Sequence, residues 1–205
     1  MSVALIGASG SVGSRILKEL SDRGHHVTAI ARHPEKIAKL PNVSAKKGDV
    51  FEKGDLASLL SGHDVVVSSV RFTASDPGVL IDAVKAAGAQ RYLVVGGAGS
   101  LEVAPSVRLI DTPEFPHAYK PEAAKGGEFL KLLRQEKELD WTFLSPSALF
   151  TAGARTAKFR LGKDQLLTTD KGSSISFEDY AVALVDEIEK PAHSRNVLLS
   201  AIERM

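Results

Sequence analysis

The chain has 205 residues, which suits one domain with a core of its own, so we predict a single domain over residues 1–205. Hydrophobic residues make up 43% and charged residues 25%, and the formal net charge is +1, so no overall charge favours nucleic acid or a membrane surface as a partner. Cysteine is absent, which excludes disulfides, thiol catalysis and cysteine metal sites. Because the apolar N-terminus is too short for a secretion signal and lacks a basic flank, we expect a cytoplasmic protein.

The first stretch combines a short apolar run with three glycines spaced three apart. Residues 3–6 have the length of a strand, and the apolar residues from position 12 to 20 recur at helical spacing. In a turn of this kind Gly7 makes the tight bend, Gly10 lets the backbone approach a diphosphate, and Gly13 lets the helix pack on the strand. The N–H groups at the helix start then bind the phosphates. The other candidates in this cofactor-binding turn are Ser9, Ser11 and Val12. A plain strand-to-helix turn is the alternative.

The end of the second predicted strand, residues 27–31, decides the type of cofactor. An acidic residue about 20 positions after the glycines would bond the ribose 2′-hydroxyl of NAD, whereas an arginine accommodates the extra phosphate of NADP. Arg32 stands at this position, and no Asp or Glu precedes Glu35. We therefore predict NADP(H), with Lys36 close enough to assist; the alternative is that Arg32 is an ordinary solvated loop residue.

The remaining chain continues to alternate strands with helices. This alternation predicts an α/β fold with a Rossmann-type, doubly wound, mostly parallel sheet. Further strands are predicted at residues 43–47, 64–67, 91–95, 140–144 and 196–199, and helices at 55–60, 77–87, 121–138 and 177–190. Residues 147–175 have a basic, glycine-containing composition, which predicts a small C-terminal lobe on the substrate side.

Ligands of open α/β sheets bind at the carboxyl ends of the strands. Asp49 and Val50 end the third strand, where they are placed to meet the adenine. The other cofactor-binding candidates at strand ends are Ser68, Ser69, Val70, Gly96 and Gly97. Residues 101–120 are rich in proline and lack periodicity, so we expect this segment to frame a substrate pocket. The pair Gly126 and Gly127 inside the following helix predicts a close contact there.

Taken together, these motifs resemble the atypical short-chain dehydrogenases, in particular the small NAD(P)H-binding group that includes NmrA-like proteins and the biliverdin/flavin reductase type. The resemblance is carried by residues 7–13, Arg32, 48–50, 94–100, 139–146 and 175–181. It implies that Pro146, Ser147 and Ala148 contact the nicotinamide, largely through the backbone. It covers nearly the whole chain and is poor evidence for a substrate.

The catalytic pair of that family is a tyrosine and a lysine four residues further on, and this chain departs from it. Glycine, alanine and leucine stand four residues after Tyr92, Tyr119 and Tyr180. Tyr119 and Lys125 are the nearest match, with Ser100 and His117 as further polar candidates; a pocket wall and a solvated helix residue are equally good interpretations of the pair. The six histidines show no metal-ligand spacing, so we predict no metal.

The resemblance implies an NADPH-dependent oxidoreductase that reduces a flavin, a quinone or a similar small acceptor by hydride transfer. Such acceptors take hydride on an electron-poor ring and a proton from water, so the missing pair is no obstacle. The alternative is a non-catalytic NADP(H)-sensing regulatory protein of the NmrA-like type, and a third possibility is an isomerase or epimerase. The expected partner is a small-molecule acceptor, and the expected state is a monomer or homodimer.

Overall fold

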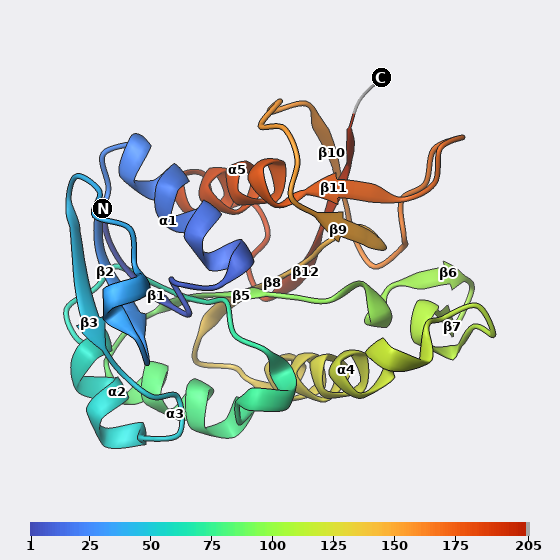
Figure 1. The fold of residues 1–205 in the computed structure, drawn as a ribbon. Helices are drawn as coiled ribbons and strands as arrows, with labels where there is room; N and C mark the ends of the chain where they lie inside the picture. The colour runs from blue at the N-terminus through green and yellow to red at the C-terminus, as the bar shows by residue number, and fades with distance from the viewer. Residues whose placement is uncertain (204–205) are drawn as a thin grey trace.

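A computed structural model describes the backbone of residues 1–203 and the side chains of residues 1–197. Its centre is an eight-stranded sheet in the order β10-β12-β8-β5-β4-β1-β2-β3 (Figure 1). The antiparallel strand β10 forms one edge, and the other neighbours in the sheet are parallel. The strands are β1 (Ser2–Ile6), β2 (His26–Ala31), β3 (Val43–Lys47), β4 (Val65–Ser68), β5 (Arg91–Val95), β8 (Asp140–Ser145), β10 (Phe159–Gly162) and β12 (Asn196–Glu203).

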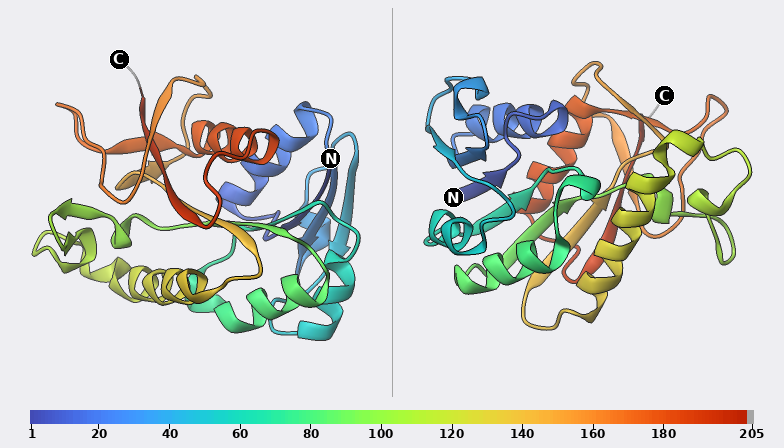
Figure 2. Two further views of the ribbon diagram at one scale, coloured as in Figure 1. Left: turned by 180° about the vertical axis from the view of Figure 1, so that it is seen from behind. Right: turned by 60° about the horizontal axis from the view of Figure 1, so that its bottom comes forward.

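Helices cover both faces of the sheet, which confirms the predicted doubly wound fold. One face carries α1 (Ser11–Asp22) and α5 (Phe177–Glu189), and the other carries α2 (Lys53–Leu60), α3 (Pro77–Ala86) and α4 (Lys120–Gln135) (Figure 2). Two apolar clusters form the core, one beneath each helical layer. Central strands β4 and β5 are buried along their whole length, as expected for parallel strands covered on both sides.

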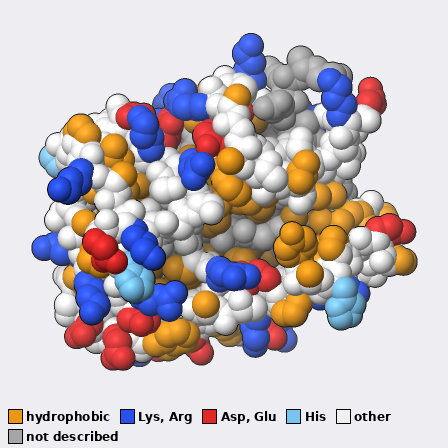
Figure 3. Space-filling model, viewed as in Figure 1, with side chains coloured by type: hydrophobic (Ala, Val, Ile, Leu, Met, Phe, Trp, Pro, Cys, Tyr) orange, Lys and Arg blue, Asp and Glu red, His pale blue; other side chains and the backbone are white. Residues whose placement is uncertain are grey.

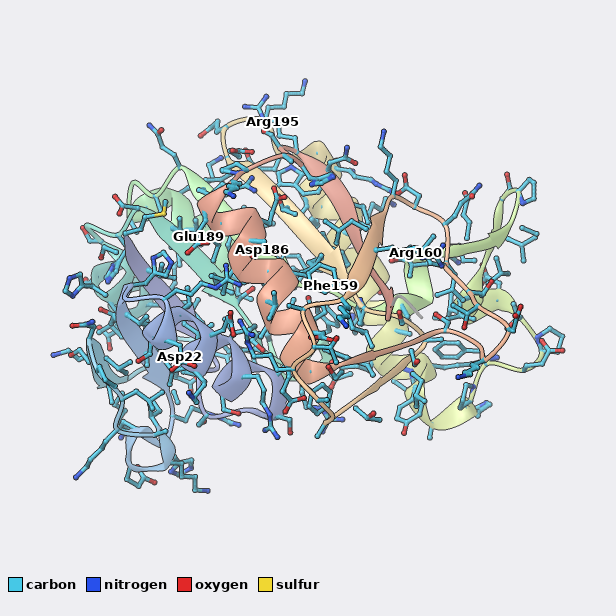
Figure 4. All side chains as sticks on the ribbon, turned by 90° about the horizontal axis from the view of Figure 1, so that it is seen from above. Asp22, Phe159, Arg160, Asp186, Glu189 and Arg195 are labelled. Carbon is cyan, nitrogen blue, oxygen red and sulfur yellow. The ribbon has the colours of Figure 1, made fainter. Side chains whose placement is uncertain are left out.

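Ion pairs join the two helices of the first layer. Arg23, just after α1, bonds Asp186 at 2.7 Å and Glu189 at 2.8 Å, both on α5. Figure 4 looks down on this layer and shows the two helices side by side. These ion pairs tie α5 to the end of α1 within this layer.

Two segments differ from the predicted elements. Helix α4 ends at Gln135 and not at residue 138, because Glu136 is extended and its carboxylate accepts the N–H of Glu138. The segment predicted as a plain loop contains the hairpin β6 (Glu102–Ala104) and β7 (Val107–Arg108), followed by short 3₁₀ turns. Neither element is long enough to give a periodic pattern in the sequence. Among the described residues, no helix is both long and apolar enough to cross a bilayer.

Candidate active site

The first glycine turn is a tight cradle between β1, α1 and the end of β4. Gly7 has a φ of +83°, and a Cβ there would lie 2.1 Å from the carbonyl oxygen of Ser69. A Cβ at Gly13 would lie 2.1 Å from the carbonyl oxygen of Gly7. These two positions therefore require glycine for packing, whereas a Cβ at Gly10 would meet only a 3.3 Å contact. The tight bend at Gly7 and the close packing at Gly13 agree with the turn expected from the sequence, and cofactor binding at these positions stays a prediction.

The N-terminus of α1 opens onto this cradle. Gly10 stands at the helix start, no side chain caps it, and the first turn carries no acidic residue. The first N–H groups of a helix have no partner within the helix, and the helix dipole makes this end positive. The turn therefore fits the diphosphate of a dinucleotide, which would take hydrogen bonds from this bare backbone.

A cavity of about 340 Å³ lies on one side of the cradle, between the ends of β2 and β3. Arg32, His33 and Lys36 line it, and His33 lies 3.1 Å from a carboxylate oxygen of Glu35. Asp49 also lines it, and one carboxylate oxygen accepts the N–H of Phe51 at 3.1 Å. Phe51 is 57% exposed and lines the same cavity, which gives an adenine ring an aromatic side chain to contact.

A larger cavity of about 940 Å³ continues from the cradle across the carboxyl ends of β4, β5 and β8. Its far walls come from the proline-rich segment after β7 and from β9 (Leu149–Thr151), which pairs with β11 (Ser174–Ser176). The segment predicted to frame a pocket, residues 101–120, therefore lines this cavity. Figure 3 shows hydrophobic side chains around the hollow and to its right, whereas charged side chains are densest at the left of the view.

Arg71 lies where the two cavities meet. The residues common to both are Gly10, Ser69, Val70 and Arg71. In the described part of the chain, no ion pair or hydrogen bond engages the Arg71 guanidinium. Glu122 of α4 fixes the adjacent loop by accepting the N–H groups of Phe72 at 2.6 Å and Thr73 at 3.0 Å. The guanidinium of Arg71 is therefore available to a diphosphate that extends from one cavity into the other.

The floor of the larger cavity is fixed by a buried tyrosine. Tyr180 of α5 donates its hydroxyl to the carbonyl oxygen of Leu144 at 2.6 Å, and Gly96 donates its N–H to the same oxygen at 2.8 Å. Burial raises the pKa of Tyr180 well above its ordinary value, so the hydroxyl stays protonated and keeps donating. Ser147 lines the same cavity, and its hydroxyl is buried without a hydrogen-bond partner among the described residues.

Burial separates the three tyrosines considered as proton donors. Tyr92 and Tyr180 are fully buried, whereas Tyr119 is 66% exposed and lines the large cavity. Lys125 is absent from the lining and forms an ion pair with Glu128 at 2.7 Å. Ser100 is also absent from the lining, and its hydroxyl lies 3.4 Å from the carbonyl oxygen of Gly97. The catalytic roles of Tyr119, Lys125 and Ser100 stay predictions.

Most predicted cofactor contacts border the two cavities. The larger cavity is lined by Gly10, Ser11, Val12, Ser69, Val70, Gly96, Gly97, Pro146, Ser147 and Ala148, and the smaller by Gly7, Ser9, Gly10, Arg32, Asp49, Val50, Ser69 and Val70. Ser68 is placed elsewhere, because its hydroxyl pairs with that of Tyr92 at 2.8 Å inside the core. Gly96 has a packing reason as well, since a Cβ there would lie 2.5 Å from the ring of Phe143.

The model of the NAD(P)H-binding family matches residues 7–191, nearly the whole chain including the cradle and both cavities. The chain belongs to this family. The resemblance to atypical short-chain dehydrogenases of the NmrA-like kind is thereby confirmed, and a nicotinamide cofactor follows from the family. Among curated relatives of this NAD(P)H-binding protein, the uncharacterized protein YwnB of Bacillus subtilis (strain 168) is 46% identical over 207 residues, covering 94% of each chain.

Solved structures similar to this NAD(P)H-binding protein carry two functional descriptions. A candidate epimerase from Bacteroides thetaiotaomicron is 42% identical with a TM-score of 0.93, covering 100% of this chain and 98% of the other. A candidate NADH-flavin reductase from Streptococcus pneumoniae is 38% identical with a TM-score of 0.82, covering both chains completely. The second supports an NAD(P)H-dependent oxidoreductase. The cytoplasmic location stays a prediction.

Sequence reasoning missed Arg71, His33 and Phe51 as residues of the site. Arg71 follows directly after the predicted candidates at the end of β4, so its place at a ligand-binding sheet edge was the available signal. Phe51 follows Val50 in the same way at the end of β3. What the sequence could not show is that the Arg71 guanidinium has no partner in the described structure, since that depends on the fold around it.

Proposed function

We propose that this protein is an NADPH-dependent oxidoreductase that reduces a planar acceptor, such as a flavin or a quinone. The observation that carries the proposal is the large, mainly apolar cavity, which continues from the dinucleotide cradle along the ends of β4, β5 and β8. A cofactor laid from the smaller cavity across Arg71 would bring its nicotinamide to the part of the lining formed by Gly96, Pro146 and Ser147. The remaining cavity is then free for an acceptor next to that ring.

The protein contributes position and a dry pocket to this reaction, while the cofactor supplies the hydride. The acceptor gains one hydride from the reduced nicotinamide and one proton from water, and oxidised nicotinamide is released. No protein acid is needed, which agrees with a cavity that Tyr119 lines and Lys125 does not. Tyr180 and Gly96 hold the floor in place from behind, through their shared bond to Leu144.

The activity is tested by mixing purified protein with NADPH and a panel of flavins and quinones and following the loss of reduced nicotinamide. We expect turnover with at least one acceptor and none above background without protein. Absence of turnover across the panel would refute the proposed activity.

The preference for NADPH rests on the basic groups of the smaller cavity. Arg32, His33 and Lys36 line it, and a guanidinium binds a phosphate with two parallel hydrogen bonds. Arg32→Asp is expected to weaken NADPH binding at least about tenfold and to improve NADH relative to NADPH. Lys131→Asp makes the same charge change on the exposed surface of α4 and is the control. If the Arg32 variant keeps the same preference for NADPH over NADH, Arg32 does not set that preference.

One observation favours a second candidate, a non-catalytic NADP(H) sensor. The chain has no lysine four residues after a tyrosine, and Lys125 forms an ion pair with Glu128 outside the cavity lining. A sensor would bind oxidised and reduced nucleotide with titratable heat in calorimetry while consuming neither in the presence of any acceptor. The same acceptor panel therefore separates the two candidates.

A further inference from the structure

The acceptor end of the large cavity, which we define by Leu109, Glu114, Phe115, Tyr119, Leu149 and Phe150, carries negative charge without a positive partner. Glu114 is exposed at this end, and no ion pair engages it in the described structure. Arg71 is the one lysine or arginine among the described residues that line the cavity, and it lies at the opposite end, beside the cradle. A cofactor diphosphate would occupy that cation.

Basic residues near the acceptor end are engaged by other groups. Arg108 forms two hydrogen bonds with Asp111, at 2.7 and 3.0 Å. Arg134 pairs with Asp164 at 3.2 Å. Lys125 is held by Glu128. Lys120, which follows Tyr119, has an electrostatic interaction with Asp111 that lowers the pKa of that carboxyl. None of these four basic residues lines the cavity, so among the described residues the lining of the acceptor end offers no lysine or arginine to a phosphate brought in with an acceptor.

The walls of the acceptor end suit a flat apolar ring. Leu149 is 58% exposed and Tyr119 66% exposed, although large apolar side chains are normally buried, and both border the cavity. Phe115 and Phe150 line the same cavity. An apolar pocket with few polar groups binds ligands mainly through the surface that it removes from water.

We infer that this site takes uncharged planar acceptors, a flavin without phosphate or a quinone, and discriminates against phosphorylated flavins. A phosphate carries between one and two negative charges at neutral pH. It would have to enter the cavity beside Glu114 and the cofactor's own phosphates, and these like charges repel it. The inference rests on the proposed reductase function and names its substrate class.

The experiment compares riboflavin with its 5′-phosphate, FMN, as acceptors for NADPH at low ionic strength. The two share one ring, so they differ at this site by the phosphate alone. We expect kcat/KM to be at least about tenfold lower for FMN than for riboflavin, because KM is higher for FMN. This difference in kcat/KM, which we call the gap, should become smaller as added salt screens the charges. Glu114→Lys should narrow the gap at least about fivefold, and Glu114→Gln should narrow it less.

Glu138→Lys makes the same charge change as Glu114→Lys, but Glu138 pairs with Lys85 at the far end of α4, and this variant should leave the gap unchanged. A binding measurement covers the case without turnover. Riboflavin and FMN fluorescence is titrated with protein saturated by oxidised NADP, where no reduction occurs, and tighter binding of riboflavin is expected.

The outcomes separate the two proposals. FMN used or bound as well as riboflavin would overturn the inference and leave the reductase function standing. Absence of turnover with every acceptor would overturn the reductase function, and the fluorescence titration would still decide whether the pocket rejects the phosphate.

Discussion

Three glycine-to-alanine variants separate packing from cofactor binding in the structure. At Gly13 the added Cβ would lie 2.1 Å from the carbonyl oxygen of Gly7, more than about 1 Å closer than an ordinary contact. The obstructing atom is backbone, so helix α1 has to move away from β1. Overpacking of this kind costs about 1–3 kcal/mol. For a chain of this size that corresponds to a fall in Tm of about 2–4 °C for each kcal/mol.

Gly10→Ala should behave differently. Its Cβ would meet only a 3.3 Å contact, so the Tm should stay within about 2 °C of the parent. Gly10 borders both cavities, however, and a methyl group there narrows the cradle. NADPH affinity is expected to fall at least about tenfold.

Gly127→Ala is the control, because a Cβ there would meet nothing within 4 Å inside helix α4. Alanine in a helix interior should raise stability by about 0.5–1 kcal/mol and leave NADPH affinity unchanged. The assays are thermal unfolding without nucleotide and calorimetry with NADPH. If Gly13→Ala has the same Tm as the parent, the close packing at Gly13 does not limit stability. If Gly10→Ala binds NADPH with the affinity of the parent, the glycine turn is not the binding site of the cofactor.

Three further variants test other parts of the site. Tyr119→Phe should keep the reductase rate within about threefold, since water supplies the proton; a loss of about 10²–10⁴ in kcat would make Tyr119 a general acid. Tyr180→Phe should lower stability by about 1 kcal/mol and reduce kcat several-fold, since the floor loses its bond to Leu144; an unchanged kcat would leave that bond a purely structural role. Arg155 hydrogen-bonds Glu19 and lowers its pKa, with Arg23 assisting against the opposing effect of burial. The pair stabilises the fold fully above the ordinary carboxyl pKa, and this stabilisation is lost as the pH falls through the lowered pKa of Glu19. Glu19→Gln should therefore lower Tm at pH 7, and its Tm should approach that of the parent only in acid below that lowered pKa; an equal Tm difference at neutral and strongly acid pH would contradict this.

Patterns within one element were predicted well from the sequence. The central strands β1 and β4 are short apolar runs, and the glycine turn showed its spacing directly. Gly126 illustrates a partial success: a Cβ there would lie 2.9 Å from the ring of Phe72, so the predicted close contact exists, but Gly127 beside it makes none. The sequence shows that small residues are present, whereas only the packing partner tells which of them is required.

Segments without periodicity were predicted only in outline. The hairpin β6–β7 is three and two residues long, and its position depends on contacts such as the bond from Glu102 N–H to the carbonyl oxygen of Asp164. The lobe after β9 is held by Asp179, whose carboxylate accepts the N–H groups of Thr156 and Ala157. Such contacts join residues more than 20 positions apart, and no local pattern encodes them.

The amino-acid sequence by itself determined the alternation of strands and helices, the glycine cradle and the cofactor class, because hydrophobic periodicity and backbone freedom are properties of neighbouring residues. Only the tertiary structure decided which polar groups remain available. Ser68 and Tyr92 satisfy each other in the core, and Lys125 is engaged by Glu128, whereas Arg71 and Glu114 keep their charges at the cavities without a partner in the described structure. The availability of a charge depends on what the fold places beside it, and that is fixed by long-range packing.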